Sequence, residues 1–158
     1  MISELQDKAR EIGINIRIWH TNNSKLFKKR DKISIKEYYT YKWNYNNIPI
    51  YYGKGIGLRA INHKNDILST FIKNNIKNMT LDIIAYNLSD LEAKVIESIL
   101  LCDKNAILMH KNEQNWDGKS LLNKRRELCF KGISYKSIFK QIVNGYYWEA
   151  IRRQIYNN

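Results

Sequence analysis

The amino-acid sequence predicts a mixed α/β (α+β) fold, and three observations predict it. Residues 38–43 and 48–52 have the pattern of two strands, and they are joined at Asn46-Asn47, a pair that tolerates the positive φ angles of a tight hairpin turn. Residues 79–85 have the composition of a third strand. Residues 89–101 have the clearest helical pattern in the chain. The sequence therefore predicts a hairpin, one further strand and packed helices.

The other elements follow from local spacing. Residues 3–11 have helical spacing, with Ser3 as a candidate N-cap, and residues 14–19 alternate like a strand. The glycines after residue 52 end the second strand of the hairpin, and residues 58–73 have the i, i+3, i+4 pattern of a helix. Three further short helices are predicted towards the end of the chain, over residues 120–130, 134–143 and 147–155.

The 158 residues include one proline and contain no internal repeat and no Pro/Ser linker, so nothing indicates separately folded domains. We expect an N-terminal extension over residues 1–37, a core over 38–112 and a basic helical segment over 113–158. The end of that segment resembles a helix-turn-helix.

The charge balance favours a polyanionic partner. The chain has 27 Lys and Arg against 15 Asp and Glu, a formal net charge of +12. Basic residues cluster at residues 25–30 and at Lys124-Arg125-Arg126, and Arg152 and Arg153 lie in the last predicted helix. A basic surface that is only solvated is the alternative.

Several classes of protein do not fit the sequence. No apolar run approaches the ~18 residues that a membrane span needs, and the first residues lack the apolar core of a signal peptide. Cys102 and Cys129 form neither a CxxC motif nor a zinc-like spacing. We expect a cytoplasmic protein with reduced thiols and no membrane association.

The stretch after the hairpin concentrates groups that bind phosphate. Gly53, Lys54 and Gly55 allow a sharp turn and leave N–H groups and an ammonium available to a phosphate. Arg59 and His63 are four residues apart, so a helix would place them on one face. These groups could converge on one phosphodiester, although the pattern of a Walker loop is absent.

Together these motifs resemble the GIY-YIG nuclease family over about residues 38–112. The resemblance rests on Tyr39-Thr40-Tyr41, on Tyr51-Tyr52-Gly53-Lys54-Gly55 ten residues after Tyr41, on Arg59 and His63, and on Leu91-Glu92-Ala93. The chain departs from the family pattern at Tyr39, where glycine would stand, and at Tyr52, where isoleucine would stand. The resemblance implies a small three-stranded antiparallel sheet flanked by helices. It also implies hydrolysis of DNA phosphodiesters with one divalent metal, usually Mg²⁺, for which Mn²⁺ can substitute.

The resemblance also implies roles for single residues. Tyr41, or His63 assisting it, takes the proton from the attacking water, and Tyr51 hydrogen-bonds the water or the phosphate. Arg59 binds the scissile phosphate, and Glu92 holds the metal. Lys54 or Arg59 would have to stabilise a Tyr41 phenolate, because a phenol of pKa near ~10 is a poor base at neutral pH.

Two of these assignments have alternatives. Ser89-Asp90-Leu91-Glu92 fits a capping box, which gives Glu92 a complete structural explanation. The family's supporting asparagine corresponds to Asn112 or His110, and spacing does not decide between them.

For Tyr41 and Tyr51 to be direct cross-strand neighbours, Asn44 must lie opposite Ile48. The sequence then predicts a three-residue loop over residues 45–47, or an equivalent bulge.

The predicted function is a metal-dependent endonuclease of double-stranded DNA. One sequence does not distinguish between a restriction, phage, mobile-element or repair role. The substrate contacts are expected from Gly53, Gly55, Asn112, Lys124, Arg125, Arg126, Arg152 and Arg153. A non-catalytic DNA-binding module and an RNA-processing nuclease are the alternatives. One hydrolytic centre cuts both strands only through a homodimer on DNA, two binding events or a reoriented enzyme.

Overall fold

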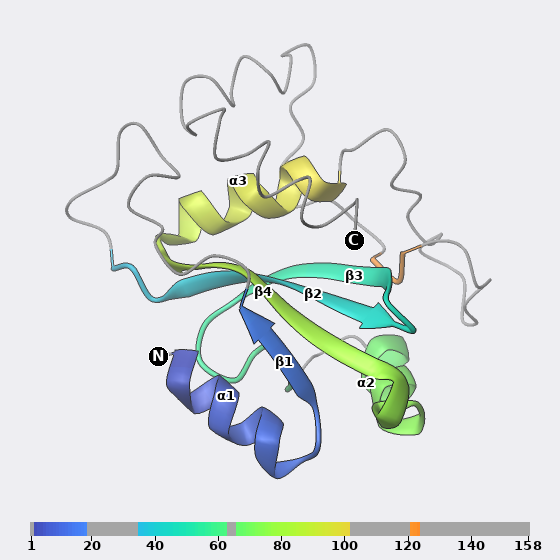
Figure 1. The fold of residues 1–158 in the computed structure, drawn as a ribbon. Helices are drawn as coiled ribbons and strands as arrows, with labels where there is room; N and C mark the ends of the chain where they lie inside the picture. Colours follow the sequence, from blue (N-terminus) through green and yellow to red (C-terminus); the bar gives the residue numbers. More distant parts are fainter. Residues whose placement is uncertain (1, 19–34, 63–65, 102–120, 124–158) are drawn as a thin grey trace.

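The computed structural model describes residues 2–18, 35–62, 66–101 and 121–123. One helix, α3, covers one face of a sheet, and two helices, α1 and α2, lie on the other (Figure 1). In chain order the elements are α1 (Ile2–Glu11), β1 (Asn15–Ile18), β2 (Tyr38–Tyr45), β3 (Ile48–Gly55), α2 (Asp66–Asn74), the 3₁₀ turn η2 (Ile76–Asn78), β4 (Met79–Leu88) and α3 (Asp90–Leu101).

The sheet has the strand order β1-β4-β2-β3. β2 is antiparallel to both β3 and β4, which confirms the mixed α/β fold and gives the expected three antiparallel strands. β1 adds a fourth strand, parallel to β4, with Asn15 opposite Thr80 and Ile18 opposite Ile83. The N-terminal segment therefore joins the same sheet as the hairpin.

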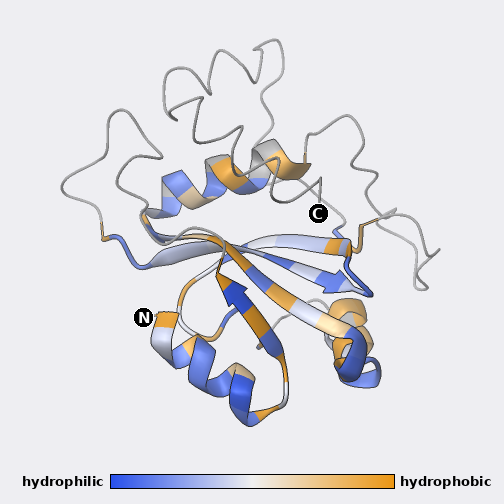
Figure 2. Cartoon of the chain, in the orientation of Figure 1, coloured by the Kyte–Doolittle hydropathy of each residue, from blue (hydrophilic) through white to orange (hydrophobic). Residues whose placement is uncertain are grey.

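The main core lies between the sheet and the layer of α1 and α2. Leu5 and Ala9 of α1, and Leu68 of α2, pack in one cluster with Tyr41 and Trp43 of β2. Figure 2 draws the hairpin strands β2 and β3 mostly in pale or hydrophilic colours, although most of their residues are buried. The buried groups of the hairpin are thus largely aromatic and polar.

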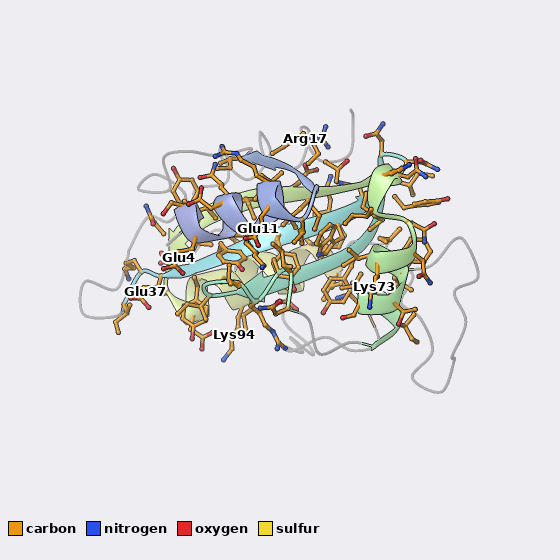
Figure 3. The ribbon with its side chains drawn as sticks, turned by 90° about the horizontal axis from the view of Figure 1, so that it is seen from below. Glu4, Glu11, Arg17, Glu37, Lys73 and Lys94 are labelled. Carbon is orange, nitrogen blue, oxygen red and sulfur yellow. The ribbon has the colours of Figure 1, made fainter. Side chains whose placement is uncertain are left out.

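Charged side chains of the helices lie outside this core. Glu4 and Glu11 on α1 and Lys73 on α2 are exposed, as Figure 3 allows the reader to follow. The remaining face of α1 presents Leu5 and Ala9 to the core, so the helix is amphipathic as its spacing predicts.

The opposite face of the sheet contains a buried ionic cluster centred on Asp82 of β4. Arg17 of β1 donates two hydrogen bonds to its carboxylate, at 2.7 and 3.0 Å, and Asn44 of β2 donates a third at 2.8 Å. Lys42 Nζ lies 3.4 Å from Asp82 Oδ2. Burial lowers the pKa of Lys42, while the neighbouring Asp82 opposes that shift. The cluster ties three strands together through one carboxylate.

The hairpin turn has two residues, not the expected three. Asn46 and Asn47 have φ angles of 49° and 65°, and Tyr45 pairs with Ile48. The register then shifts between Trp43 and Asn44, so β3 contains a bulge with Ile50 as its extra residue. The expected bulge exists, but it moves the register in the other direction from the one that direct pairing of the two tyrosines required.

One predicted helix was wrong in its extent. The pattern over residues 58–73 predicts a continuous helix, whereas α2 begins at Asp66 and residues 56–62 form successive turns. Gly57 adopts φ +57°, and the hydroxyl of Tyr39 accepts the N–H of Ala60, so the backbone here follows contacts with β2. Apolar spacing at Leu58 and Ile61 arises because both pack on the core from a turn.

The start of the predicted helix 120–130 also differs. Leu121 forms a strand-type bridge, and the N–H of Leu122 donates to the carbonyl oxygen of Ile50 at 2.6 Å. The predicted helices over 134–143 and 147–155, with the rest of 120–130, lie outside the described residues. Among the helices that the structure describes, none has the length and apolar character to cross a membrane.

Candidate functional site

The tyrosines of the hairpin gather on one face of the sheet. Tyr41 lies opposite Gly53, and Tyr51 lies opposite Trp43, so the two tyrosines are diagonal neighbours on the same face rather than a direct pair. Their rings stack with centroids 6.1 Å apart. Tyr39 continues the row, with its ring centroid 5.9 Å from that of Tyr41. The prediction that Tyr41 and Tyr51 share a face is confirmed, and the prediction that they are directly opposite is wrong.

The ring of Tyr41 fills the space that a side chain at position 53 would occupy. A β-carbon built on Gly53 would collide with Cζ and Oη of Tyr41. The glycine, which the sequence indicated as a turn former, instead lies within β3 and lets the Tyr41 ring cross the strand. Its function here is to make room for the ring.

Arg59 lies in the turns that follow β3, close to this row of rings. Its Cβ is 3.0 Å from the position that a β-carbon on Gly55 would occupy. The Tyr39 hydroxyl lies 3.1 Å from the same position, and the charge of Arg59 weakly opposes the rise in the pKa of Tyr39 and Tyr41 that burial causes. The structure therefore places Arg59 beside Tyr39, at the end of the tyrosine row, although not from a helix.

The pKa of both Tyr39 and Tyr41 is raised, so both phenols are protonated at neutral pH. Burial raises the pKa of Tyr39 to about 12. Burial raises the pKa of Tyr41 well above its ordinary value of 10, and the neighbouring Tyr51, Tyr39 and Glu97 add to that shift. Tyr41 in this state keeps its proton at neutral pH, and a protonated phenol is able to donate a hydrogen bond.

Lys54 lies on the other face of the sheet. It pairs with Thr40, whose hydroxyl faces the carbonyl oxygen of Ala93 in α3. Lys54 Nζ donates to Asp90 Oδ1 at 2.6 Å, and Lys94, labelled in Figure 3, lies 3.2 Å from the other oxygen of Asp90. The hydrogen bond from Lys54 is the main reason why the pKa of Asp90 is lowered. Lys54 does not converge with Tyr41 and Arg59 in this structure.

Glu92 forms the capping box that its sequence predicts. The N–H of Ser89 donates to Glu92 Oε1 at 2.8 Å, and the N–H of Glu92 donates to the Ser89 hydroxyl at 3.1 Å. Lys36 Nζ lies 3.8 Å from the same Oε1. One carboxylate oxygen of Glu92 is therefore already committed to the start of α3.

Glu97 is a carboxylate that the sequence analysis missed. It is 6% exposed and lies on the buried stripe of α3 with Ala93 and Leu100. α3 lies on the opposite face of the sheet from the row of tyrosines, so Glu97 does not join that row, and its charge adds to the raised pKa of Tyr41 only after burial and the neighbouring phenols. The signal was present in the sequence, because a glutamate four residues after Ala93 and three before Leu100 falls on the apolar face of a helix, where charge is rare.

Asn123 is a second residue that the sequence analysis missed. Its side-chain oxygen accepts the N–H of Tyr52 at 3.0 Å, and its NH₂ group donates to the carbonyl oxygen of Tyr52 at 2.7 Å. The amide thus pairs with β3 in the way that a neighbouring strand would. Asn123 therefore supports the sheet, whereas Asn112 and His110, the residues for which the resemblance implies such a role, lie outside the described residues; the interpretation of residues 120–130 as a helix concealed Asn123.

The other predicted site residues lie outside the described part of the chain: His63, His110, Asn112, Lys124, Arg125, Arg126, Arg152 and Arg153. Within the part that the structure does describe, no three or more His, Cys, Asp and Glu side chains gather as a metal cluster. Mg²⁺ can be held by one or two carboxylates together with substrate phosphates, so a single buried glutamate is a compatible donor.

Comparisons with models of protein families, with curated proteins and with solved structures found no match.

Proposed function

We propose that the protein is a metal-dependent endonuclease that hydrolyses phosphodiester bonds of double-stranded DNA, with a site of the GIY-YIG type. The observation that carries the proposal is the row of Tyr39, Tyr41 and Tyr51 on one side of the hairpin, with Arg59 beside Tyr39 at its end. Phenols and a guanidinium in one place suit the binding of a phosphate and the hydrolysis of its ester. The net charge of +12 supports a polyanionic substrate.

Arg59 is the proposed phosphate ligand. Its guanidinium can donate two parallel hydrogen bonds to the scissile phosphate, and it opposes the negative charge that grows in the transition state. Tyr51 is only half-buried, so its hydroxyl is the phenol better placed to reach the phosphate or the attacking water. Tyr41 contributes as a protonated hydrogen-bond donor, which makes His63 the proposed acceptor of the water's proton.

The carboxylate that we assign to the metal is Glu92, as the sequence resemblance implies. Its Oε1 accepts the Ser89 N–H and lies near Lys36, so the metal would bind this carboxylate beside the start of α3. When bound, Mg²⁺, or Mn²⁺ in its place, supplies positive charge to the phosphate oxygens and to the leaving oxygen. Lys54 is proposed to contact DNA from the neighbouring face, after exchanging Asp90 for a phosphate.

A plasmid-cleavage assay tests the proposal. Purified protein should nick supercoiled DNA in Mg²⁺ and not in EDTA. Arg59→Ala should lower the single-turnover rate by roughly 10²-fold or more, because a preorganised donor to the transition state is lost. Lys73→Ala is the matched control: it removes one exposed cation from α2 and should leave the rate unchanged.

The same assay separates the alternatives. DNA binding without cleavage in any divalent metal would indicate a non-catalytic module, and faster cleavage of a matched RNA would indicate an RNA-processing nuclease. The double change Arg152→Ala and Arg153→Ala should weaken DNA binding and lower the salt dependence of log K by about one unit per lost phosphate contact. It should largely preserve the turnover of bound DNA.

A further inference from the structure

The hydroxyl of Tyr39 holds the turn that carries Arg59. It donates to the carbonyl oxygen of Gly57 at 2.8 Å and accepts the N–H of Ala60 at 3.1 Å. These two partners flank Arg59 in the sequence, one before it and one directly after it. The Tyr39 side chain is 2% exposed, so both bonds are shielded from water.

A second side chain of β2 bonds to the other backbone group of Ala60, its carbonyl oxygen. Trp43 Nε1 donates to the carbonyl oxygen of Ala60 at 2.9 Å. The N–H and the C=O of Ala60 are therefore both bonded to buried aromatic side chains of one strand. Since β2 is an inner strand of the sheet and pairs with both β4 and β3, it is a rigid support for the turn.

Close packing reinforces these bonds. A β-carbon at Gly55 would stand 3.1 Å from Tyr39 Oη and 3.0 Å from Arg59 Cβ. The end of β3, the Tyr39 hydroxyl and the base of the Arg59 side chain thus meet without spare room. Arg59 leaves the backbone at a position that these contacts fix.

We propose that Tyr39 is a positioning residue, whose hydroxyl fixes the turn over residues 57–60 so that Arg59 is preorganised toward Tyr41 and the substrate phosphate. The proposal rests on the proposed nuclease function. Tyr39 stands where the GIY-YIG pattern has a glycine, which has no side chain to make these bonds. The arrangement is therefore a property of this chain and not of the pattern that it resembles.

The physical reason for such a support is that charge stabilisation in a transition state depends on donors that are already oriented. A guanidinium on an unsupported turn would have to be ordered during the reaction, which lowers the rate without removing the charge. Losing the Tyr39 hydroxyl should therefore reduce catalysis more than DNA binding.

The test compares Tyr39→Phe with Tyr38→Phe. The first removes the hydroxyl that bonds Gly57 and Ala60, and the second removes the hydroxyl of the preceding residue while keeping the ring near Lys54. In Tyr39→Phe, hydrogen exchange of the Ala60 amide should accelerate about tenfold or more, the change expected for one lost hydrogen bond. Single-turnover cleavage should fall by about tenfold, whereas the Kd for DNA in Ca²⁺ should change less than about twofold. Tyr38→Phe should change none of these.

Combination with Arg59→Ala decides whether Tyr39 acts through Arg59. If it does, Tyr39→Phe produces no further loss of rate in the Arg59→Ala background. Independent, multiplying losses would overturn the proposal, as would an Ala60 amide whose exchange is unchanged. If the wild-type protein cleaves no nucleic acid, the proposed function and the catalytic part of this inference both fail, while the exchange rate still decides whether Tyr39 holds the turn.

Melting temperatures establish that the variants are folded. Should Tyr39→Phe not fold, Trp43→Phe removes the bond to the other side of the Ala60 peptide and should give the same pattern of reduced rate and preserved binding. An equal loss of rate and binding in that variant would contradict the proposal.

Discussion

Gly53 lies directly opposite Tyr41, and the Tyr41 ring occupies the space that a side chain at position 53 would fill. The ring is 1% exposed and is packed against Tyr39 and Tyr51, so it has no free direction in which to move. The position of the Tyr41 ring therefore depends on a glycine at position 53.

We therefore expect Gly53→Ala to displace the Tyr41 ring. Overpacking of this kind destabilises a protein by about 1–3 kcal/mol, and the displaced phenol should also reduce cleavage. Urea denaturation and the single-turnover rate measure the two effects. Ile48→Ala, at an exposed position at the start of the same strand, should change the free energy of unfolding by less than about 0.5 kcal/mol. If Gly53→Ala unfolded at the same urea midpoint as the wild-type protein, the Tyr41 ring would be able to move aside without a loss of stability.

The two glutamates of α3 should separate in their effects. Glu92→Gln preserves an acceptor for the Ser89 N–H, so it should cost well under ~1 kcal/mol of stability, but it should abolish Mg²⁺-dependent cleavage if Glu92 holds the metal, because the amide lacks the negative charge. Glu97→Gln, which changes a second buried glutamate of α3, should leave cleavage near the wild-type rate. Cleavage rates across Mg²⁺ concentrations, with melting temperatures, distinguish them. The reverse result would assign the metal to Glu97 instead.

Asp82 should be among the residues on which folding most depends. Asp82→Asn would leave Arg17 and Lys42 facing each other across a neutral amide, and removal of one partner from a buried ion pair typically destabilises by about 3–5 kcal/mol. Arg17→Gln should have a smaller effect, of about 1 kcal/mol or less, because the Arg17 side chain is 43% exposed. Denaturant titration of both variants at pH 7 measures the difference. Equal effects would indicate that Lys42 contributes little to the cluster.

The ion pair between Lys54 and Asp90 should be visible in the acid dependence of stability. Because Lys54 lowers the pKa of Asp90 in the folded state, the stabilisation is present above the unfolded pKa of about 3.9 and is lost as pH falls through the lower folded value. The free-energy difference between wild type and Lys54→Met should therefore shrink between pH 5 and pH 2. It should be below about 1 kcal/mol even at pH 7, since Asp90 is partly exposed. Lys94→Met serves as the comparison, with a smaller and similarly directed change.

Local signals predicted the parts of the fold that local chemistry determines. Alternation and the Asn46-Asn47 turn predicted β2 and β3, and the Ser89 capping box predicted the start of α3. The segment over residues 56–62 was predicted as helix because its apolar spacing is helical, but hydrogen bonds from distant strand residues determine its path. Sequence periodicity contains no information about those bonds.

The candidate site was predictable to the same extent. Tyr41, Tyr51 and Arg59 were found by motif; the two tyrosines stack, and Arg59 lies beside Tyr39 at the end of the same row. Glu97 and Asn123 were missed because their significance depends on tertiary packing, on which face of α3 is buried and on which segment pairs with β3. Lys54 was assigned to the same side as Tyr41 because sequence proximity does not distinguish the two faces of a strand.

The single extra residue of β3, at Ile50, decides which of two adjacent tyrosines faces Tyr41. With the bulge, Tyr51 is on the side of Tyr41; in an unbroken ladder that begins from the same turn, Tyr52 would be opposite Tyr41 and Tyr51 would face away. Loss of the bulge at constant length would therefore exchange one tyrosine for the other and would also turn Gly53 away from the Tyr41 ring, whereas deletion of Ile50 would close the ladder with Tyr51 still opposite Trp43. The bulge, and not the number of tyrosines, consequently decides the site, and an alignment of other sequences to this one that counts only tyrosines would overlook it.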